Sequence, residues 1–409
     1  MRNWLARLPA WRDAAKPQAL GQAMVGGGTR SGRDSKSIGG ALVAIEGLTR
    51  SATGVRDYGA FARDGMMRNA VVYRAVRMIS EAAASVRLRA YAGADELAVH
   101  PLLDLLAQPS AACDGVELLE SLYGYLLVSG NAYIDGSAVG GQVVGLHLLR
   151  PDRVRVVPDQ DGWPAAFEYS VDARKMLIRG DVVPGVPRIR HLRLFHPAND
   201  HYGLSPVEAA ATAIDVHNTA GHWNKALLDN AARPSGALVY ATGGHLTTEQ
   251  FDRLKDELQE NFQGARNAGR PLLLEGGLDW KAMSMTPRDM DFIEAKHAAA
   301  REIALALGVP PMLLGIPGDN TYANFQEANR TLWRQTVLPL VQRTARSLSQ
   351  WLQPAWGDGV VLRPDIDAVE ALSAERESLW GRLEAASFLS LNEKRAAVGY
   401  GPVDGGDDV

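Results

Sequence analysis

A double proline between two long helical patterns constrains this chain more than any other feature. Residues 308–325 read GVPPMLLGIPGDNTYANF, and apolar residues recur at helical spacing on both sides of this stretch. Proline lacks a backbone N–H and its ring clashes with the preceding turn, so Pro310 and Pro311 forbid one continuous helix. Gly308 is the residue type that commonly ends a helix. The pattern therefore predicts two long helices joined by a stiff apolar turn and a small polar loop.

Composition excludes several classes of protein. With 409 residues and 46% hydrophobic content, the chain is long enough for two or three domains with a sizeable core. A net charge of −4 argues against a protein that is basic throughout and binds nucleic acid. The single cysteine, Cys113, excludes an intrachain disulfide and fits a reducing cytoplasm. The most apolar stretch, residues 298–315, contains charges and prolines, so we expect no membrane span and, without an apolar N-terminal segment, no signal peptide.

The N-terminal part differs from the rest. Residues 1–40 contain seven Lys and Arg against two Asp, and 26–40 are rich in glycine and serine. Such composition is typical of a flexible segment without a packed core. We therefore predict that residues 1–64 form a flexible basic tail.

Residues 65–204 carry the patterns of an α+β domain. One helical face gathers four apolar residues at helical spacing: Val72, Val76, Ile79 and Ala83. A second helix is expected to start at Asp114, with Glu117 completing a capping box. Over 131–196 the period changes to short β-branched or alternating runs divided by Gly, Pro and Asp. This segment is predicted to form an antiparallel sheet.

A long helix and a small module are expected next. Ser205 is a good N-cap, Pro206 suits the first helical position, and Glu208 completes a capping box, so a helix is predicted up to Asn230. Residues 236–285 then read as a β-α-β-β module. Its helix is expected to be capped by Thr247 and Gln250 and to bury one apolar stripe, which consists of Phe251, Leu254, Leu258 and Phe262.

Two further helices flank the double proline. Thr286 caps and Pro287 opens the first, which ends at Gly308. The second is expected over 322–353, with Asn324 and Glu327 as its cap and a kink at Pro339. The alternative is that Asn320 or Thr321 caps the turn between the two helices.

The motifs of common catalytic sites are missing. The sequence contains no GxxxxGK[ST] phosphate loop and no dinucleotide fingerprint. His217 and His222 are five residues apart, roughly 140° around a helix, which does not suit a zinc site. His191, His196 and His201 also repeat at intervals of five, so a metal-dependent nuclease or protease is retained as an alternative hypothesis. We otherwise predict no enzyme activity, no metal and no cofactor.

A family resemblance accounts for these elements in order. The runs GLSPVEAAATAI, GARNAGRPLLLEGGL and REIALALGVPPMLLGIPGDNTYANFQEANRTLW, followed by SLNEKRAAVGYGPVDGGD, resemble the portal proteins of long-tailed bacteriophages, including the portals of prophages and gene transfer agents. The resemblance covers about residues 65–395. A capsid subunit or a head-tail adaptor is a further alternative.

The resemblance implies a role in a virion or phage-like particle assembled in the bacterial cytoplasm. Portals form rings, usually of twelve subunits, at one capsid vertex, and double-stranded DNA passes through them non-specifically during packaging and ejection. The implied partners are the major capsid protein, the terminase large subunit and the head-tail adaptor. No membrane is implied.

The resemblance also implies an α+β portal fold with named parts. These are a wing (65–204), a first stem helix (205–235), a clip (236–285), a second stem helix (286–308), a tunnel loop (309–323), a kinked wing helix with a strand (324–364), and a crown with the C-terminal tail (365–409).

The loop after the double proline is the candidate contact with DNA. Its expected tip consists of Asp319, Asn320, Thr321 and Tyr322, and the sequence has no Lys or Arg between Arg301 and Arg330. Neutralising phosphates with basic side chains makes DNA binding tight, so a non-basic tip suits a conduit. Three apolar residues before the tip are expected to pack against neighbouring subunits: Met312, Leu313 and Leu314.

Six basic residues on the expected stem and clip are candidate contacts with the channel or the terminase: Lys225, Arg233, Arg266, Arg270, Lys281 and Arg288. Surface salt bridges are the alternative for each of them.

Overall fold

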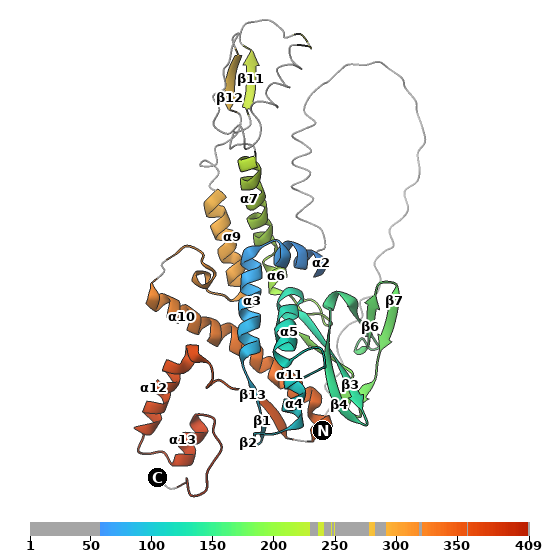
Figure 1. Cartoon of the computed structure of the whole chain (residues 1–409), viewed down its shortest axis with the longest axis vertical. Coiled ribbons are helices and arrows are strands. Elements are labelled where there is room, and N and C mark those ends of the chain that lie inside the picture. The colour runs from blue at the N-terminus through green and yellow to red at the C-terminus, as the bar shows by residue number, and fades with distance from the viewer. Residues whose placement is uncertain are drawn as a thin grey trace, which may run out of the picture. The chain divides into compact units, whose positions relative to one another are not determined.

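The computed structural model describes residues 58–229, 236–240, 247, 249, 278–282, 292–318, 321–357 and 359–407 (Figure 1). The chain divides into two units, Met1–Gly54 and Val55–Val409, and every described residue belongs to the second. Most of the predicted tail therefore lies outside the described residues. None of the described helices is long and apolar enough to cross a membrane.

The helix predicted around Val72 and Ile79 is present, but residues 58–64, which were expected to belong to the flexible tail, are helical as well. A short helix α2 (Tyr58–Ala60) and a π-helical segment η1 (Phe61–Met67) lead into α3 (Ala70–Ser85). The Asn69 side chain caps α3 by accepting hydrogen bonds from the backbone N–H groups of Val71 and Val72. The four residues predicted to share one face of α3 are all buried. This confirms the helical periodicity.

A second helical layer packs against α3. The helix α4 (Pro101–Ala107) follows strands β1 (Leu88–Ala92) and β2 (Asp95–Leu97), and α5 (Gly115–Ser129) comes next. The Asp114 side chain accepts a 2.8 Å hydrogen bond from the backbone N–H of Glu117, so the predicted N-cap is confirmed. Helices α3 and α5 are in direct contact.

The β-rich segment is antiparallel, as predicted, but its strands divide among several sheets. The strands are β3 (Asn131–Val139), β4 (Gln142–Leu149), β5 (Val154–Pro158), β6 (Pro164–Val171), β7 (Arg174–Ile178), β8 (Asp181–Val183), β9 (Val186–Pro187) and β10 (Ile189–Arg193). They form sheets with the orders β10-β3-β4, β5-β6-β7 and β8-β9. The 3-10 turn η2 (Pro151–Arg153) separates β4 from β5. The sequence pattern fixed the strands but not their partners.

The long helix expected from Ser205 is interrupted. Its cap is confirmed, because Ser205 Oγ accepts from the N–H groups of Val207 and Glu208. The first turn, α6 (Pro206–Ala209), ends at Ala210, and α7 (Ala211–Asp229) follows. Ser205 Oγ also donates a 2.8 Å hydrogen bond to the Leu127 carbonyl of α5. This tertiary anchor on the first turn left no signal in the local sequence.

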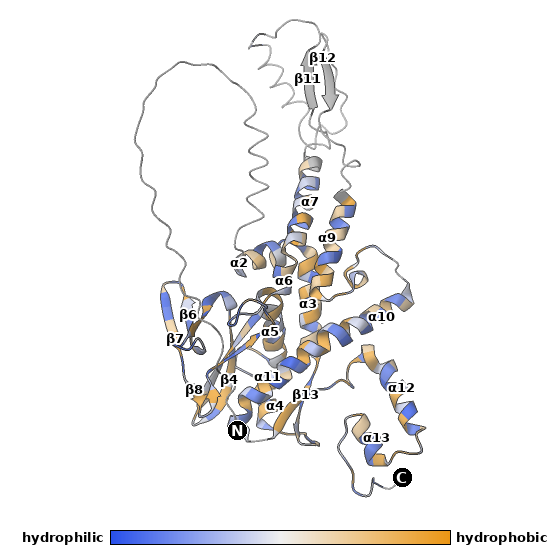
Figure 2. Ribbon diagram, turned by 180° about the vertical axis from the view of Figure 1, so that it is seen from behind, coloured by the Kyte–Doolittle hydropathy of each residue, from blue (hydrophilic) through white to orange (hydrophobic). Residues whose placement is uncertain are grey.

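Helix α9 (Phe292–Leu307) packs along α7, and the two lie side by side in both views (Figures 1 and 2). Strands β11 (Gly236–Tyr240) and β12 (Leu278–Ala282) pair antiparallel, with Leu238 opposite Trp280. Both were predicted as strands. Apart from residues 247 and 249, the predicted helix between them lies outside the described residues, as do the residues expected to cap α9.

The last long helix is irregular near the predicted kink. Helix α10 (Tyr322–Leu332) continues through a π-helical segment η5 (Trp333–Val337) into α11 (Leu338–Trp356). Pro339 is the second residue of α11 and lies directly after the π-helical segment; because proline has no N–H to donate to a carbonyl of the preceding turn, it interrupts the regular hydrogen-bond pattern here. The cap of α10 is Thr321 and not Asn324, because Thr321 Oγ1 accepts a 3.2 Å hydrogen bond from the Asn324 N–H.

The C-terminal part begins with β13 (Val360–Pro364), which pairs with β1 to complete the sheet β13-β1-β2. The 3-10 turn η6 (Glu370–Leu372), α12 (Ser373–Glu384) and α13 (Leu391–Ala397) follow. Ser390 and Glu393 form a complete capping box on α13. Neither α12 nor α13 contains a buried residue, whereas Leu362, Val369 and Leu372 before them are buried in the main core, so this part is anchored through its first residues.

The main hydrophobic core lies between α3, α5, α11 and the sheet of β3 and β4. Trp351 of α11 is fully buried, and its indole N–H donates a 2.7 Å hydrogen bond to the Pro187 carbonyl. Apolar residues are concentrated on α3, which contacts both α9 and α11 (Figure 2). The helix pair α7 and α9 is thereby fixed on the same core as the sheets.

Candidate functional site

The connection from α9 to α10 contains the same helix-ending pattern twice. Leu307-Gly308-Val309-Pro310 ends α9, and Leu314-Gly315-Ile316-Pro317 ends a 3-10 helix, η4 (Pro311–Leu314). Both glycines adopt positive φ angles, 69° and 71°. Each is followed by a buried β-branched residue. The predicted stop at Gly308 is thus confirmed and is repeated seven residues later.

Hydrogen bonds identify both endings as Schellman motifs. After α9, the Gly308 N–H donates to the Leu305 carbonyl at 3.0 Å and the Val309 N–H to the Ala304 carbonyl at 2.9 Å. After η4, the N–H groups of residues 315 and 316 donate to the carbonyls of residues 312 and 311, both at 3.2 Å. This pairing satisfies carbonyls that a helix end leaves free. The turn is therefore a fixed structure.

The first ending is locked from a third helical segment. Thr336 Oγ1, in the π-helical η5, donates a 2.6 Å hydrogen bond to the Gly308 carbonyl. A Cβ atom added at Gly308 would lie 2.7 Å from the hydroxyl oxygen of Thr336. The glycine is required both by its backbone angle and by this close approach.

The second ending is fastened to α9. Ile316 is buried in a cluster with Ala300 and Ala304 of α9. Arg301 Nη2 donates a 2.8 Å hydrogen bond to the Pro317 carbonyl. The backbone therefore leaves α9, turns twice and returns against it before the polar tip begins.

The apolar turn packs within its own chain. Leu313 and Leu314 are partly buried against the main core, and Met312 is half-buried as well. Leu313 and Leu314 therefore have partners within the chain, and the expected contact of this turn with neighbouring subunits stays a prediction. The local sequence could not show that α9 and α3 approach this turn.

Of the four predicted tip residues, two are described. Thr321 is the exposed cap of α10. Tyr322 opens α10 with 78% of its surface exposed, and its hydroxyl accepts a 3.0 Å hydrogen bond from Gln326 Nε2. Phe325, one turn further on, is also exposed. Asp319 and Asn320 lie outside the described residues. The described part of the tip is polar, aromatic and uncharged.

Only two of the six basic candidates lie among the described residues. Lys225 lies on the exposed side of α7, and Lys281 lies in β12 opposite Ala237. The remaining four candidates are outside the described residues: Arg233, Arg266, Arg270 and Arg288.

A buried amide network that sequence reasoning missed holds α7 to α3. Asn69 Nδ2 donates to Asn218 Oδ1 at 3.0 Å and lies 3.1 Å from His217 Nδ1. Asn218 Nδ2 in turn donates to the Asp64 carbonyl at 2.8 Å. Burial, and then the Lys296 ammonium of α9, lower the pKa of His217, which keeps the imidazole neutral and able to accept.

Two of the three histidines weighed as metal ligands, His191 and His196, have other partners, whereas the buried Nδ1 of His201 has none among the described residues. His191 Nε2 lies 3.0 Å from Asn131 Oδ1, and the imidazole stacks on Tyr133 with ring centroids 4.3 Å apart. Burial lowers the pKa of His191 to about 3, with smaller effects from nearby cations. His196 Nδ1 accepts a hydrogen bond from the Ala198 N–H. Within the described part of the chain, no three His, Cys, Asp or Glu side chains could together hold a metal ion.

The Asn131 side chain joins the β-sheet to the start of α6. Its Oδ1 accepts from the Gly203 N–H at 2.8 Å, and its Nδ2 donates to the Gly203 carbonyl at 3.3 Å. A Cβ atom at Gly203 would lie 2.1 Å from the Gly130 carbonyl, so two backbones cross in contact here. The hydrogen bonds of Asn131 and the close approach at Gly203 fix the direction in which the chain enters α6 and α7. Asn131 therefore has a structural role.

Comparison with known proteins agrees with this architecture. The family model described as phage portal protein matches residues 70–399. A protein of Rickettsia bellii (strain RML369-C) is 43% identical over 350 residues, which cover 85% of this chain and 90% of the relative. The probable portal protein of Streptomyces phage phiC31 is 25% identical over 350 residues, which cover 82% of this chain and 75% of that one.

A solved structure is also similar to this chain. A chain from the neck of a native gene transfer agent particle, computed with C12 symmetry, is 49% identical and matches with a TM-score of 0.65, covering 90% of this chain and all of that one. The mixed helix-and-sheet architecture is thus that of solved portal structures. The chain belongs to the phage portal protein family.

Proposed function

We propose that this chain is the repeating subunit of a portal ring that surrounds double-stranded DNA at one vertex of a phage-like particle. Family membership and the similarity to a chain in the neck of a C12-symmetric gene transfer agent particle support a ring of twelve. The observation that carries the proposal is the doubly terminated turn between α9 and α10, which leads into a tip without Lys or Arg.

The parts of the fold receive roles in this proposal. Residues 65–204 with 324–364 form the wing, 205–235 and 286–308 form the two stem helices, and 236–285 form the clip. Residues 309–323 form the tunnel loop at the narrowest point of the channel, and 365–409 form the crown and C-terminal tail. The packing of α7 along α9 supports the paired stem.

The tunnel loop acts by touching DNA without retaining it. Each phosphate that a basic side chain neutralises steepens the salt dependence of binding by about 0.9 units of log K per log salt. In a ring of twelve, one Lys or Arg on the tip would be repeated twelve times around the duplex. Thr321 and Tyr322 add no charge at the tip. The two Schellman turns fix the backbone that leads into the loop.

The proposed partners follow from the same roles. The wing contacts the major capsid protein, and the clip docks the terminase large subunit during packaging and the head-tail adaptor afterwards. The ring contributes a passage and a docking platform, and the ATP-driven work belongs to the motor. No catalytic role is proposed for this chain.

Purified full-length protein provides the test. Mass photometry and electron microscopy are expected to show closed rings with a central hole and a mass near twelve times the 44.1 kDa of the chain. Monodisperse monomers at high protein concentration, or turnover of ATP or DNA by clean protein, would count against the proposal.

A further inference from the structure

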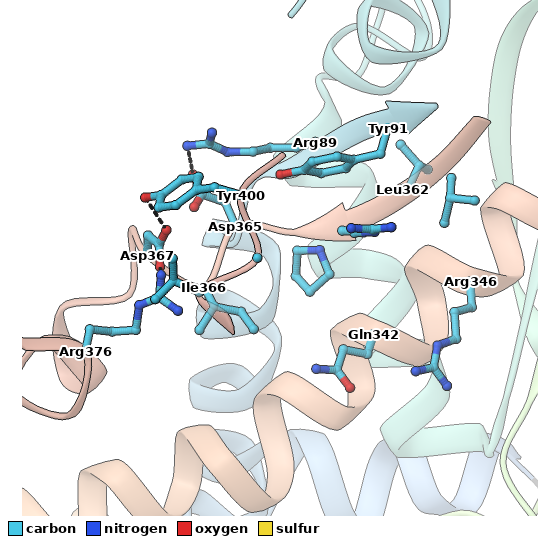
Figure 3. Close-up of a pocket in the computed structure, with 15 residues that line it drawn as sticks. Arg89, Tyr91, Gln342, Arg346, Leu362, Asp365, Ile366, Asp367, Arg376 and Tyr400 are labelled. Carbon is cyan, nitrogen blue, oxygen red and sulfur yellow. Dashed lines mark hydrogen bonds and ion pairs between the residues drawn. The ribbon is translucent and has the colours of Figure 1, made fainter. Parts of the chain in front are cut away.

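A pocket of about 360 Å³ lies where the C-terminal part meets the core (Figure 3). Gln342 and Arg346 project into it from α11, and Tyr91 and Arg89 come from β1. The opposite side is formed by the chain after β13 and by the residues that follow α13, which include Tyr400. Segments distant in sequence therefore line one pocket.

The pocket carries more positive than negative charge. Four arginines line it, at positions 89, 346, 363 and 376, against two aspartates, at 365 and 367. Both aspartates already have partners. The buried Asp365 carboxylate accepts a 2.6 Å bond from Arg89, and Asp367 pairs with Arg376 and accepts a 3.0 Å bond from the Tyr400 hydroxyl.

Two of the arginines have no carboxylate partner among the described residues. The guanidinium of Arg363 lies over the Tyr91 ring, 4.6 Å from its centroid, and donates a 3.1 Å hydrogen bond to the Gly93 carbonyl. Arg346 is exposed on α11 and makes no hydrogen bond or ion pair within that part of the chain. Gln342 lies one helical turn before Arg346 and adds a neutral amide donor to the same pocket.

We propose that this pocket binds a phosphate group through Arg346 and Arg363. Guanidinium groups offer a planar fork of N–H donors that matches phosphate oxygens, and neither of these two pairs with a carboxylate in the described part of the chain. The contacts of Arg363 with Tyr91 and Gly93 hold its guanidinium in place, while Arg346 remains free to complete the site. The source of the phosphate is either the DNA backbone or a free phosphate ion.

The site is distinct from the tunnel loop, and only the DNA source depends on the proposed portal function. It also includes the residues that attach the C-terminal part, because Asp367, Arg376 and Tyr400 line the same cavity. A phosphate bound here would contact the core and lie beside this attachment. Binding at the pocket is therefore expected to protect the C-terminal part from proteolysis.

The test compares Arg346→Gln with Arg343→Gln in the full chain in its assembled state. Arg343 lies one turn earlier on α11, outside the residues that line the pocket, so its replacement removes the same charge from the same helix. Binding of a 20-base-pair duplex is measured by fluorescence anisotropy over a salt series. Binding of inorganic phosphate is measured by calorimetry, and ring assembly is checked by mass photometry.

The expected result is that Arg346→Gln weakens binding about tenfold at low salt, as the loss of one charge-assisted contact predicts. For DNA, the slope of log K against log salt should also fall by about 1. Binding of inorganic phosphate with no effect of either variant on DNA would assign the site to free phosphate.

Equal effects of both variants, or no binding of either probe, would overturn the proposal. Loss of ring assembly in Arg346→Gln alone would show instead that this arginine contacts a neighbouring subunit. Intact rings without phosphate binding would refute the phosphate site and leave the proposed portal function standing.

Discussion

Replacing Gly308 by alanine tests how the turn after α9 is held. The backbone there has φ of 69°, and placing an L-residue in this region costs about 1–2 kcal/mol. The added Cβ would also lie 2.7 Å from Thr336 Oγ1, which must move and lose its 2.6 Å bond to the Gly308 carbonyl. That loss adds about 1 kcal/mol. We therefore expect Gly308→Ala to lower the free energy of unfolding by about 2–3 kcal/mol.

Gly315→Ala is the matched control for this prediction. Gly315 has nearly the same angle, φ of 71°, but nothing lies within 4 Å of an added Cβ. Only the conformational cost remains, about 1–2 kcal/mol, and at both glycines the smaller flexibility of the unfolded chain offsets part of it. The assay is urea unfolding followed by tryptophan fluorescence, because Trp333 and Trp351 flank Thr336 in the same long helix.

A double-mutant cycle separates the two contributions to the cost at Gly308. Thr336→Ala relieves the steric conflict, so Gly308→Ala in that background is expected to cost about as much as Gly315→Ala. Equal destabilisation by Gly308→Ala and Gly315→Ala in the wild-type background would refute the reasoning, because the close approach of Thr336 would then have no energetic effect.

Three further changes test other parts of the account. Asn69→Ala removes the cap of α3 and leaves Asn218 without its 3.0 Å partner, so the free energy of unfolding is expected to fall by about 2 kcal/mol. Thr321→Ala removes an exposed cap and should lower the free energy of unfolding by at most about 1 kcal/mol in the same assay. The folded-state pKa of His191 is about 3, below its usual 6.5, so the unfolded state binds a proton at higher pH than the folded state does. The contribution of neutral His191 to stability should therefore be complete above pH 6.5 and be lost as the pH falls towards 3. In urea titrations, His191→Gln should show a shallower decline in stability over that window. Tyr322→Arg places a guanidinium on the tip and is expected to raise DNA affinity and to steepen its salt dependence by several units in the assembled ring, whereas Val99→Arg, at a position 86% exposed on another loop, should have little effect.

Local sequence signals identified most of the elements but not how they are joined. The periodicity over Val72 and Ile79 and the caps at Asp114 and Ser205 gave helices that the structure contains. Those signals depend on neighbours within a few residues, which the sequence shows directly. Strand partners and the break at Ala210 depend on contacts between distant segments, so they could not be read from local patterns.

In the candidate site, too, some features could be predicted from local sequence and others depend on contacts between distant segments. The stop at Gly308 was predictable, and the repeated Leu-Gly-Val/Ile-Pro pattern could have revealed the second ending at Gly315. The lock by Thr336 and the burial of Leu313 and Leu314 could not, because they require α9, η4 and η5 to meet in space. Arg346 and Arg363 were likewise ordinary arginines in the sequence and became notable only where one pocket gathered them.

The most direct measurement is a cryo-electron microscopy reconstruction of the assembled ring with DNA in its channel. The account predicts twelve subunits, with Thr321 and Tyr322 lining the narrowest constriction beside the duplex and no basic side chain between them and the DNA. A reconstruction that places these two residues on the outer wall, away from the axis, would contradict it.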